Sequence, residues 1–129
     1  MKIHHIGYLV KNIEKAKAAF VKLGFVLESD VVYDDFRKVD ICFLTKDGYR
    51  VELVSPKSED SVVSRLIKQY RNAPYHLCYE TERFDEERSA LEANGFTCMD
   101  EPCPAPALGG KRVAFLMSAS IGIIELYEA

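Results

Sequence analysis

Two histidines and two glutamates lie at corresponding places in the two halves of the sequence, and these residue types bind divalent metals. Adding 71 to the position of His5 gives His76, and adding 73 to the position of Glu52 gives Glu125. Two imidazoles and two carboxylates suit Zn²⁺, Ni²⁺, Co²⁺, Fe²⁺ or Mn²⁺, and they leave coordination positions open for water or substrate. The four residues therefore predict a catalytic metal site that acts as a Lewis acid on a substrate oxygen.

The correspondence between the halves carries this prediction, because each residue alone has an ordinary explanation. A single histidine in an apolar segment is more often a hydrogen-bonded core residue, and a single glutamate in a strand more often faces solvent. However, Glu52 lies between Val51 and Leu53, and Glu125 lies between two apolar residues in the same way. Burying a carboxylate costs several kcal/mol unless it is paired or bound to a metal. We expect His4 to lie on the strand face opposite His5, with a structural role or exposed to solvent.

The repeat extends beyond the four residues and predicts the elements that carry them. Corresponding pairs are His5 to Tyr8 with His76 to Tyr79, Gly24-Phe25 with Gly95-Phe96, and Phe43-Leu44 with Phe115-Leu116. Apolar spacing predicts strands at 3–10, 25–32, 38–44 and 49–54 with a helix from Asn12 to Leu23, and then strands at 75–81, 96–99, 111–117 and 122–127 with a helix at 84–94. The predicted fold is therefore α+β, with two βαβββ modules.

Between the modules, residues 58–72 have the pattern of a short amphipathic helix, for which Ser61 is the expected cap. This divides the chain into a first module at 1–57, a connector helix at 58–73 and a second module at 74–129, all within one structural unit. Residues 101–110 are rich in Pro, Ala and Gly, and we expect them to form a loop.

Composition excludes several classes of function. The chain has 129 residues, 48% of them hydrophobic, and a net charge of −3 without a basic stripe, so nucleic acid is a poor partner. No apolar run approaches the roughly 20 residues that cross a bilayer. Met1-Lys2 leads directly into a strand without signal-peptide features, which predicts a cytoplasmic protein. The four cysteines contain no C-x-x-C pair and are expected to be reduced, although Cys98 and Cys103 could pair or bind a metal.

These segments resemble the vicinal oxygen chelate superfamily, which includes glyoxalase I, methylmalonyl-CoA epimerase, ring-cleaving dioxygenases and bleomycin-resistance proteins. The resemblance covers essentially the whole chain and rests on 5–10, 51–56, 75–80, 110–116 and 124–126. It implies paired βαβββ modules whose curved mixed sheets surround a metal cleft. The matching metal ligands are His5, Glu52, His76 and Glu125.

The set of two His and two Glu is similar to that of glyoxalase I. The resemblance implies a metal-dependent lyase or isomerase that converts a methylglyoxal–thiol hemithioacetal to a 2-hydroxyacyl thioester through an enediolate. Glu125 would be the base that removes the proton, and Glu52 would be the opposing carboxylate. The implied cofactor is a divalent ion, Ni²⁺, Zn²⁺, Co²⁺ or Mn²⁺.

Methylmalonyl-CoA epimerase is a close alternative, because 52–61 and 110–116 also resemble that enzyme. Asp40 occupies a strand position where some epimerases carry a catalytic carboxylate, although an exposed residue or an ion-pair partner is the simpler interpretation. Both reactions begin with metal-assisted removal of a proton next to a carbonyl. A third alternative is a member that binds a small ligand without turnover; such members usually lack the full metal set.

Basic residues could bind the carboxylates or phosphates of a thiol carrier such as glutathione or CoA. Arg37, Lys111 and Arg112 are the candidates for this substrate contact, with surface charge as the alternative explanation for each. Two small sheets would also expose edges that a second copy could cover, so we expect a homodimer.

Overall fold

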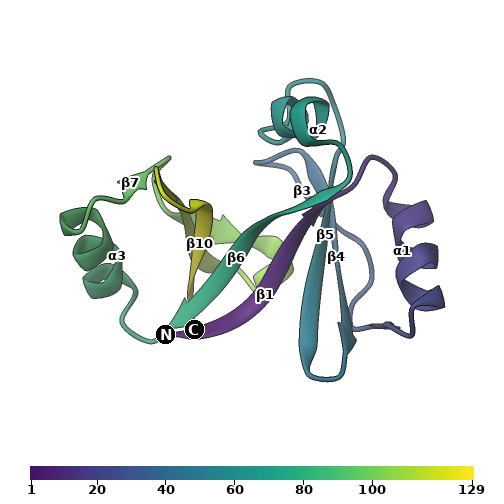
Figure 1. Ribbon diagram of the computed structural model, residues 1–129, viewed down its shortest axis with the longest axis horizontal. Coiled ribbons are helices and arrows are strands. Elements are labelled where there is room, and N and C mark those ends of the chain that lie inside the picture. Colours follow the sequence, from purple (N-terminus) through teal and green to yellow (C-terminus); the bar gives the residue numbers. More distant parts are fainter. The chain divides into compact units, whose positions relative to one another are not determined.

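The computed structural model describes residues 1–129 and divides into two compact units. One unit contains Met1–His5 and His76–Ala129, and the other contains Ile6–Tyr75. The chain forms ten strands and three α-helices. The sheet is mixed: β1 (Lys2–Leu9) pairs with β5 (Tyr49–Pro56) and β6 (Ala73–Thr81) with β10 (Gly122–Glu128) in parallel, whereas the other pairings within each unit are antiparallel. The predicted α+β fold with mixed sheets is therefore confirmed (Figure 1).

In the Ile6–Tyr75 unit, the strand order is β2-β4-β5-β1, and β3 pairs with β4. The elements are β1 (Lys2–Leu9), α1 (Ile13–Lys22), β2 (Val26–Leu27), β3 (Val32–Asp34), β4 (Val39–Lys46), β5 (Tyr49–Pro56) and α2 (Ser64–Tyr70). The turn between β4 and β5 is Asp47-Gly48, and both residues have positive φ, at 52° and 82°. Asp and Gly tolerate this backbone better than most residues, and Asp-Gly is a common pair in tight hairpin turns.

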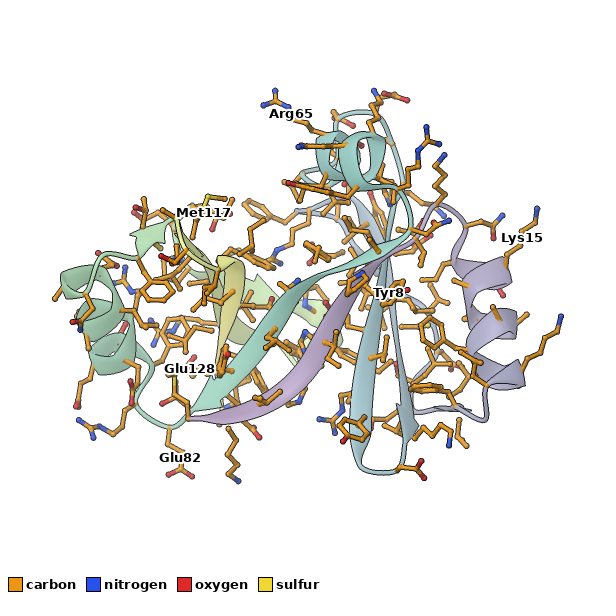
Figure 2. The ribbon with its side chains drawn as sticks, viewed as in Figure 1. Tyr8, Lys15, Arg65, Glu82, Met117 and Glu128 are labelled. Carbon is orange, nitrogen blue, oxygen red and sulfur yellow. The ribbon has the colours of Figure 1, made fainter.

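Helix α1 covers one face of that unit's strands (Figure 1). The Asn12 side chain accepts a hydrogen bond from the Lys15 backbone amide at 3.0 Å and begins the helix. The core beneath it combines Val10, Ile13, Cys42, Leu44, Val51 and Leu53. Tyr8, labelled in Figure 2, packs its ring against this core. Its ring lies edge-on to that of Phe20, with centroids 5.3 Å apart. Because alternate strand residues point to opposite faces, the residues between these core positions face away from α1.

The other unit repeats this order, with strands β6-β10-β9-β7 and β8 paired with β9. Its elements are β6 (Ala73–Thr81), α3 (Phe84–Ala93), β7 (Thr97–Cys98), β8 (Cys103–Ala105), the 3₁₀-helix η1 (Pro106–Leu108), β9 (Lys111–Ser118) and β10 (Gly122–Glu128). Its core beneath α3 consists of Phe84, Ala114, Leu116, Ile124 and Leu126. None of the helices in the structure combines the length and apolar character needed to cross a membrane.

Three predicted elements differ from the structure. The expected strand at 25–32 is only Val26–Leu27, and the chain resumes pairing at β3. The expected loop at 101–110 was wrong in part, because β8 pairs with β9 within it. The connector helix begins at Ser64 rather than after Ser61, whose hydroxyl instead donates to the Arg37 carbonyl at 2.9 Å. Since β3 and β8 are separated by the same 71 positions as His5 and His76, the repeat is more complete than the apolar pattern indicates.

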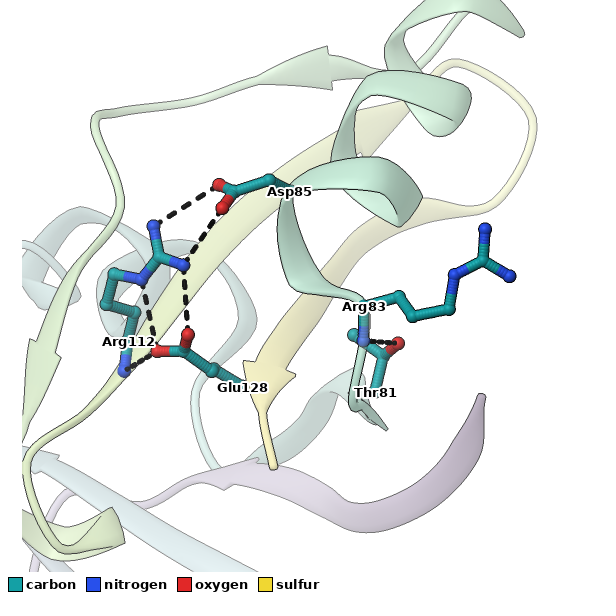
Figure 3. Close-up of polar contacts among 5 residues, drawn as sticks. All are labelled: Thr81, Arg83, Asp85, Arg112 and Glu128. Carbon is teal, nitrogen blue, oxygen red and sulfur yellow. Dashed lines mark hydrogen bonds and ion pairs between the residues drawn. The ribbon is translucent and has the colours of Figure 1, made fainter.

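Arg112 on β9 joins α3 to the sheet (Figure 3). Its guanidinium donates to both carboxylate oxygens of Asp85 at 3.2 Å, and to those of Glu128 at 2.9 and 3.1 Å. The same group lies 4.7 Å from the centre of the Phe84 ring. Helix α3 lacks a side-chain N-cap, so this cluster replaces a cap in holding its first turn.

Replacing Arg112 with Lys should loosen the first turn of α3, because an ammonium cannot make two bidentate contacts at once. We expect faster amide hydrogen exchange at the start of the helix and a lower melting temperature. Arg88→Lys is the matched control, since Arg88 pairs with Glu92 farther along the same helix. Equal exchange rates in the two variants would contradict the role assigned to Arg112.

Cys42 is fully buried in the core beneath α1, and all four cysteines are free thiols. Burial raises the pKa of the Cys42 thiol from its ordinary 9.0 to about 11. The thiol therefore stays protonated in the folded protein at pH values where the unfolded chain already loses the proton.

The stability contributed by Cys42 should be complete below pH 9 and be lost as the pH rises towards 11. Comparing denaturant unfolding of the wild type and Cys42→Ala isolates this effect, because other titrating groups are common to both. The difference in free energy of unfolding should change by about 2 kcal/mol in favour of the variant between pH 8 and pH 11. A difference that is constant with pH would refute it.

Candidate metal centre

Three of the four predicted ligands lie in one compact unit, on strands that are neighbours in the sheet. His5 comes from β1, His76 from β6 and Glu125 from β10. Glu125 is level with Phe115 on β9 and with Cys78 on β6, two residues beyond His76. The core under α3 takes the alternate residues, including Ile124 and Leu126 on β10. Strand alternation therefore turns Glu125 and His76 to the face away from α3.

The side chains of these residues converge on one point. His5 Nε2 lies 3.1 Å from Glu125 Oε1 and 3.3 Å from His76 Nε2, and His76 Nε2 lies 3.3 Å from the same carboxylate oxygen. All three residues are buried, with 1%, 5% and 4% of the surface of His5, His76 and Glu125 exposed. Two ring nitrogens and one carboxylate oxygen thus meet within the distances that separate ligands around one ion.

Burial alone would raise the pKa of the Glu125 carboxyl, but the neighbouring imidazoles of His5 and His76 hold this pKa well below its ordinary range. Its Oε1 atom is inaccessible to solvent and receives no hydrogen bond of acceptable geometry, although two ring nitrogens lie close to it. A buried anion that faces two nitrogens without forming a hydrogen bond at this oxygen has the arrangement that a cation would complete. The donor set therefore fits a divalent metal.

Two aromatic contacts border the centre. The Phe115 ring meets the His76 ring edge-on, with centroids 5.3 Å apart. The Nδ1 atom of His4 lies 2.8 Å from the Nδ1 atom of His5. The sequence pattern did not predict this contact between His4 and His5, because it places the two residues on opposite faces of the strand. Strand alternation fixes the direction of Cβ, whereas ring nitrogens lie farther out and can approach a neighbouring residue.

Glu52, the fourth predicted ligand, belongs to the Ile6–Tyr75 unit and is 4% exposed. It is level with Phe43 on β4 and with Gly7 on β1. Its neighbours Val51 and Leu53 join the core under α1, so Glu52 faces away from that helix. Glu52 beside Phe43 repeats the relation of Glu125 to Phe115, as the sequence repeat predicts.

Asp40 lies on the other face of β4. It is level with Ser55 and alternates with Val39 and Ile41, so it points to the α1 side of the strand, opposite Glu52. Its carboxylate accepts a hydrogen bond from Lys57 Nζ at 3.1 Å. The structure thus does not bring Asp40 to the face that carries Glu52.

The predicted substrate-binding cations occupy different environments. Arg37 is buried, and its guanidinium donates to the Asp34 carboxylate at 2.7 Å. Arg112 is engaged by Asp85 and Glu128, as described above (Figure 3). Lys111 is exposed on β9. A substrate anion would therefore have to compete with a carboxylate for Arg37 or Arg112. Lys111 instead offers an ammonium group on an exposed side chain.

The fold and this centre agree with a match to a protein family. Residues 4–115 match the model of the Glyoxalase/Bleomycin resistance protein/Dioxygenase superfamily. The chain belongs to this superfamily, and the resemblance to vicinal oxygen chelate proteins inferred from the sequence is confirmed.

Individual relatives include epimerases. Mitochondrial methylmalonyl-CoA epimerase of Bos taurus is 24% identical over 132 residues, which cover 99% of this chain and 74% of the relative. The crystal structure of hypothetical protein BH1468 from Bacillus halodurans C-125 has a TM-score of 0.88 at 27% identity, covering 99% of this chain and 94% of the other. A Streptomyces coelicolor methylmalonyl-CoA epimerase in complex with 2-nitronate-propionyl-CoA has a TM-score of 0.83 at 20% identity, covering 98% and 96%. These comparisons do not support the closer resemblance to glyoxalase I.

His76→Ala should weaken the binding of Zn²⁺ or Co²⁺ by more than about 100-fold, since it removes a ligand rather than an outer partner. Isothermal titration of the metal-free protein measures the affinity, and one ion per chain is expected for the wild type. Cys103→Ala is the control, because a partly exposed thiol is the competing kind of ligand. A large loss of metal affinity in Cys103→Ala, with the affinity of His76→Ala unchanged, would place the metal at a site that does not include His76.

Proposed function

We propose that the protein is a metal-dependent enzyme of the methylmalonyl-CoA epimerase type, which moves a proton on the carbon next to a thioester carbonyl. The observation that carries the proposal is the buried Glu125 carboxylate facing the imidazoles of His5 and His76. The superfamily match is compatible with both reactions, and the methylmalonyl-CoA epimerase among the relatives supports a CoA thioester over the hemithioacetal of glyoxalase I.

We propose that Glu52 completes the ligand set. Its support is the continuity of β1, in which His5 is followed two positions later by Gly7, the register partner of Glu52. Residues two apart on a strand share a face, so one strand links the histidine and the second glutamate. A divalent ion held by these residues would act as a Lewis acid, polarising the carbonyl oxygen and acidifying the adjacent carbon.

The two glutamates supply the acid–base chemistry. In the proposed reaction the ionised Glu125 takes the proton from the carbon next to the carbonyl, and Glu52, which starts the turnover protonated, delivers its own proton to the opposite face. Proton exchange with solvent then returns both groups to their starting states. An epimerase needs both groups, because inversion requires removal from one face and delivery to the other. The ring of Phe115, which contacts His76, and the buried ring of Phe43 are apolar neighbours that would limit the access of water to the two carboxylates.

Glyoxalase I chemistry remains a second candidate, favoured by the two histidines and two glutamates of the predicted ligand set. It uses the same first step on a different thiol adduct. Assays with methylmalonyl-CoA and with the methylglyoxal–glutathione hemithioacetal separate the two substrates. A homodimer remains a prediction, and sedimentation at micromolar concentration tests it.

Glu125→Gln should reduce proton exchange by at least about 100-fold, because an amide is not a base. The measurement follows the loss of the C2 proton signal of methylmalonyl-CoA in D₂O by NMR, with metal added. Glu14→Gln makes the same chemical change on the exposed face of α1 and should retain full activity. If Glu125→Gln exchanged the proton at the wild-type rate, Glu125 would not be the base.

Asp40→Asn should leave the exchange rate within about threefold of the wild type, since Asp40 lies on the opposite face of β4 from Glu52. A small effect on stability is expected from loss of the exposed Lys57 pair. If Asp40→Asn instead loses as much activity as Glu125→Gln, the reaction uses a carboxylate on the α1 side and the proposed pair of glutamates is wrong.

A further inference from the structure

His4 makes a contact that the proposed reaction does not use. Its Nδ1 atom lies 2.8 Å from His5 Nδ1, while His5 Nε2 points to Glu125 and His76. The two rings are 5.1 Å apart at an angle of 78°. The two nitrogens of the His5 ring therefore have separate partners, one within the candidate metal centre and one outside it.

The chemistry of imidazole determines the direction of this hydrogen bond when a metal is bound. A neutral imidazole carries one proton, and the nitrogen that binds a metal must be the one without it. If His5 binds through Nε2, its proton is on Nδ1 and is donated towards His4. His4 Nδ1 must then be the acceptor, and the proton of a neutral His4 ring is on its Nε2 atom.

We propose that His4 is a positioning residue that holds His5 in the tautomer with its proton on Nδ1, leaving Nε2 free to bind the metal. The role of His4 rests on the proposed metal centre, whereas the contact between His4 and His5 is present without a metal. Partners of this kind commonly orient metal-binding histidines, and their loss costs about 10–100-fold in metal affinity. Here the partner is the residue that immediately precedes the ligand in sequence.

The surroundings of His4 keep its ring in place for this task. The ring meets that of Tyr127 on β10 edge-on, with centroids 4.9 Å apart and an angle of 61°. The Cys78 sulfur lies within 4.8 Å of ligand atoms of both His4 and His5. His4 is half-buried, so water competes less for its nitrogen than it would on an open surface.

Two variants separate the acceptor of His4 from the packing of its ring. His4→Phe keeps an aromatic ring against Tyr127 but removes the acceptor, and it should weaken Zn²⁺ binding about 10–100-fold. His4→Asp provides an acceptor oxygen and should recover most of that loss. Competition with a chelating dye measures the affinities. Equal affinity in the wild type and His4→Phe, or equal losses in both variants, would overturn the proposal.

A spectroscopic measurement on the metal-free protein separates this inference from the proposed function. Long-range ¹H–¹⁵N NMR reports which His5 nitrogen carries the proton. We expect a larger share of the Nδ1–H form in the wild type than in His4→Phe. A share of the Nδ1–H form that is no larger in the wild type than in His4→Phe, or that His4→Asp does not restore, would overturn the role of His4. A protein that binds no metal while keeping the Nδ1–H form would instead refute the metal centre.

Cys78→Ala distinguishes the positioning role from a separate metal site built on His4, His5 and Cys78, which also lie close together. The positioning role predicts Zn²⁺ affinity within about threefold of the wild type, because the sulfur donates nothing to the centre. A loss as large as that of His4→Phe would make Cys78 and His4 ligands and refute the proposal.

Discussion

The candidate metal centre depends on one buried carboxylate that lies between two imidazoles. Removing the Glu125 carboxylate from water costs several kcal/mol, and Glu125 is 4% exposed beside His5 and His76. A fold can tolerate such a group when opposite charge or hydrogen bonds offset the cost. The two nitrogens near Oε1, without an accepted hydrogen bond of good geometry, make a cation the simplest completion of the site.

The structural repeat explains how a chain of 129 residues presents two buried glutamates on corresponding strands. Each half has a helix that covers one sheet face, and each turns a glutamate to the other face beside a phenylalanine, Phe43 or Phe115. The apolar cores under α1 and α3 determine the strand register, and a shift by one residue would turn the glutamates into those cores. The packing that stabilises the fold therefore also orients the side chains that would do chemistry.

The sequence predicted the candidate ligands because the repeat could be recognised from residue types alone. His5, His76 and Glu125 converge as expected, and most helices and strands lie within a few residues of their predicted bounds. Strand β8 was missed because Pro104 breaks an apolar pattern, although a short edge segment can pair despite a proline. The contact between His4 and His5 was not predicted, because strand alternation gives the direction of each Cβ but not the position of the ring nitrogens. The residue pattern did not distinguish the epimerase reaction from that of glyoxalase I, because both begin with removal of a proton next to a carbonyl. The relatives provided the evidence that favours the epimerase.

X-ray absorption at the edge of bound Zn²⁺ or Co²⁺ tests the central claim most directly, because it identifies the ligand atoms in the purified protein. We expect a shell of nitrogen and oxygen at about 2.0–2.2 Å, with the outer scattering of two imidazole rings and no sulfur. Sulfur at about 2.3 Å, or a spectrum without imidazole scattering, would contradict a centre built on His5, His76 and Glu125.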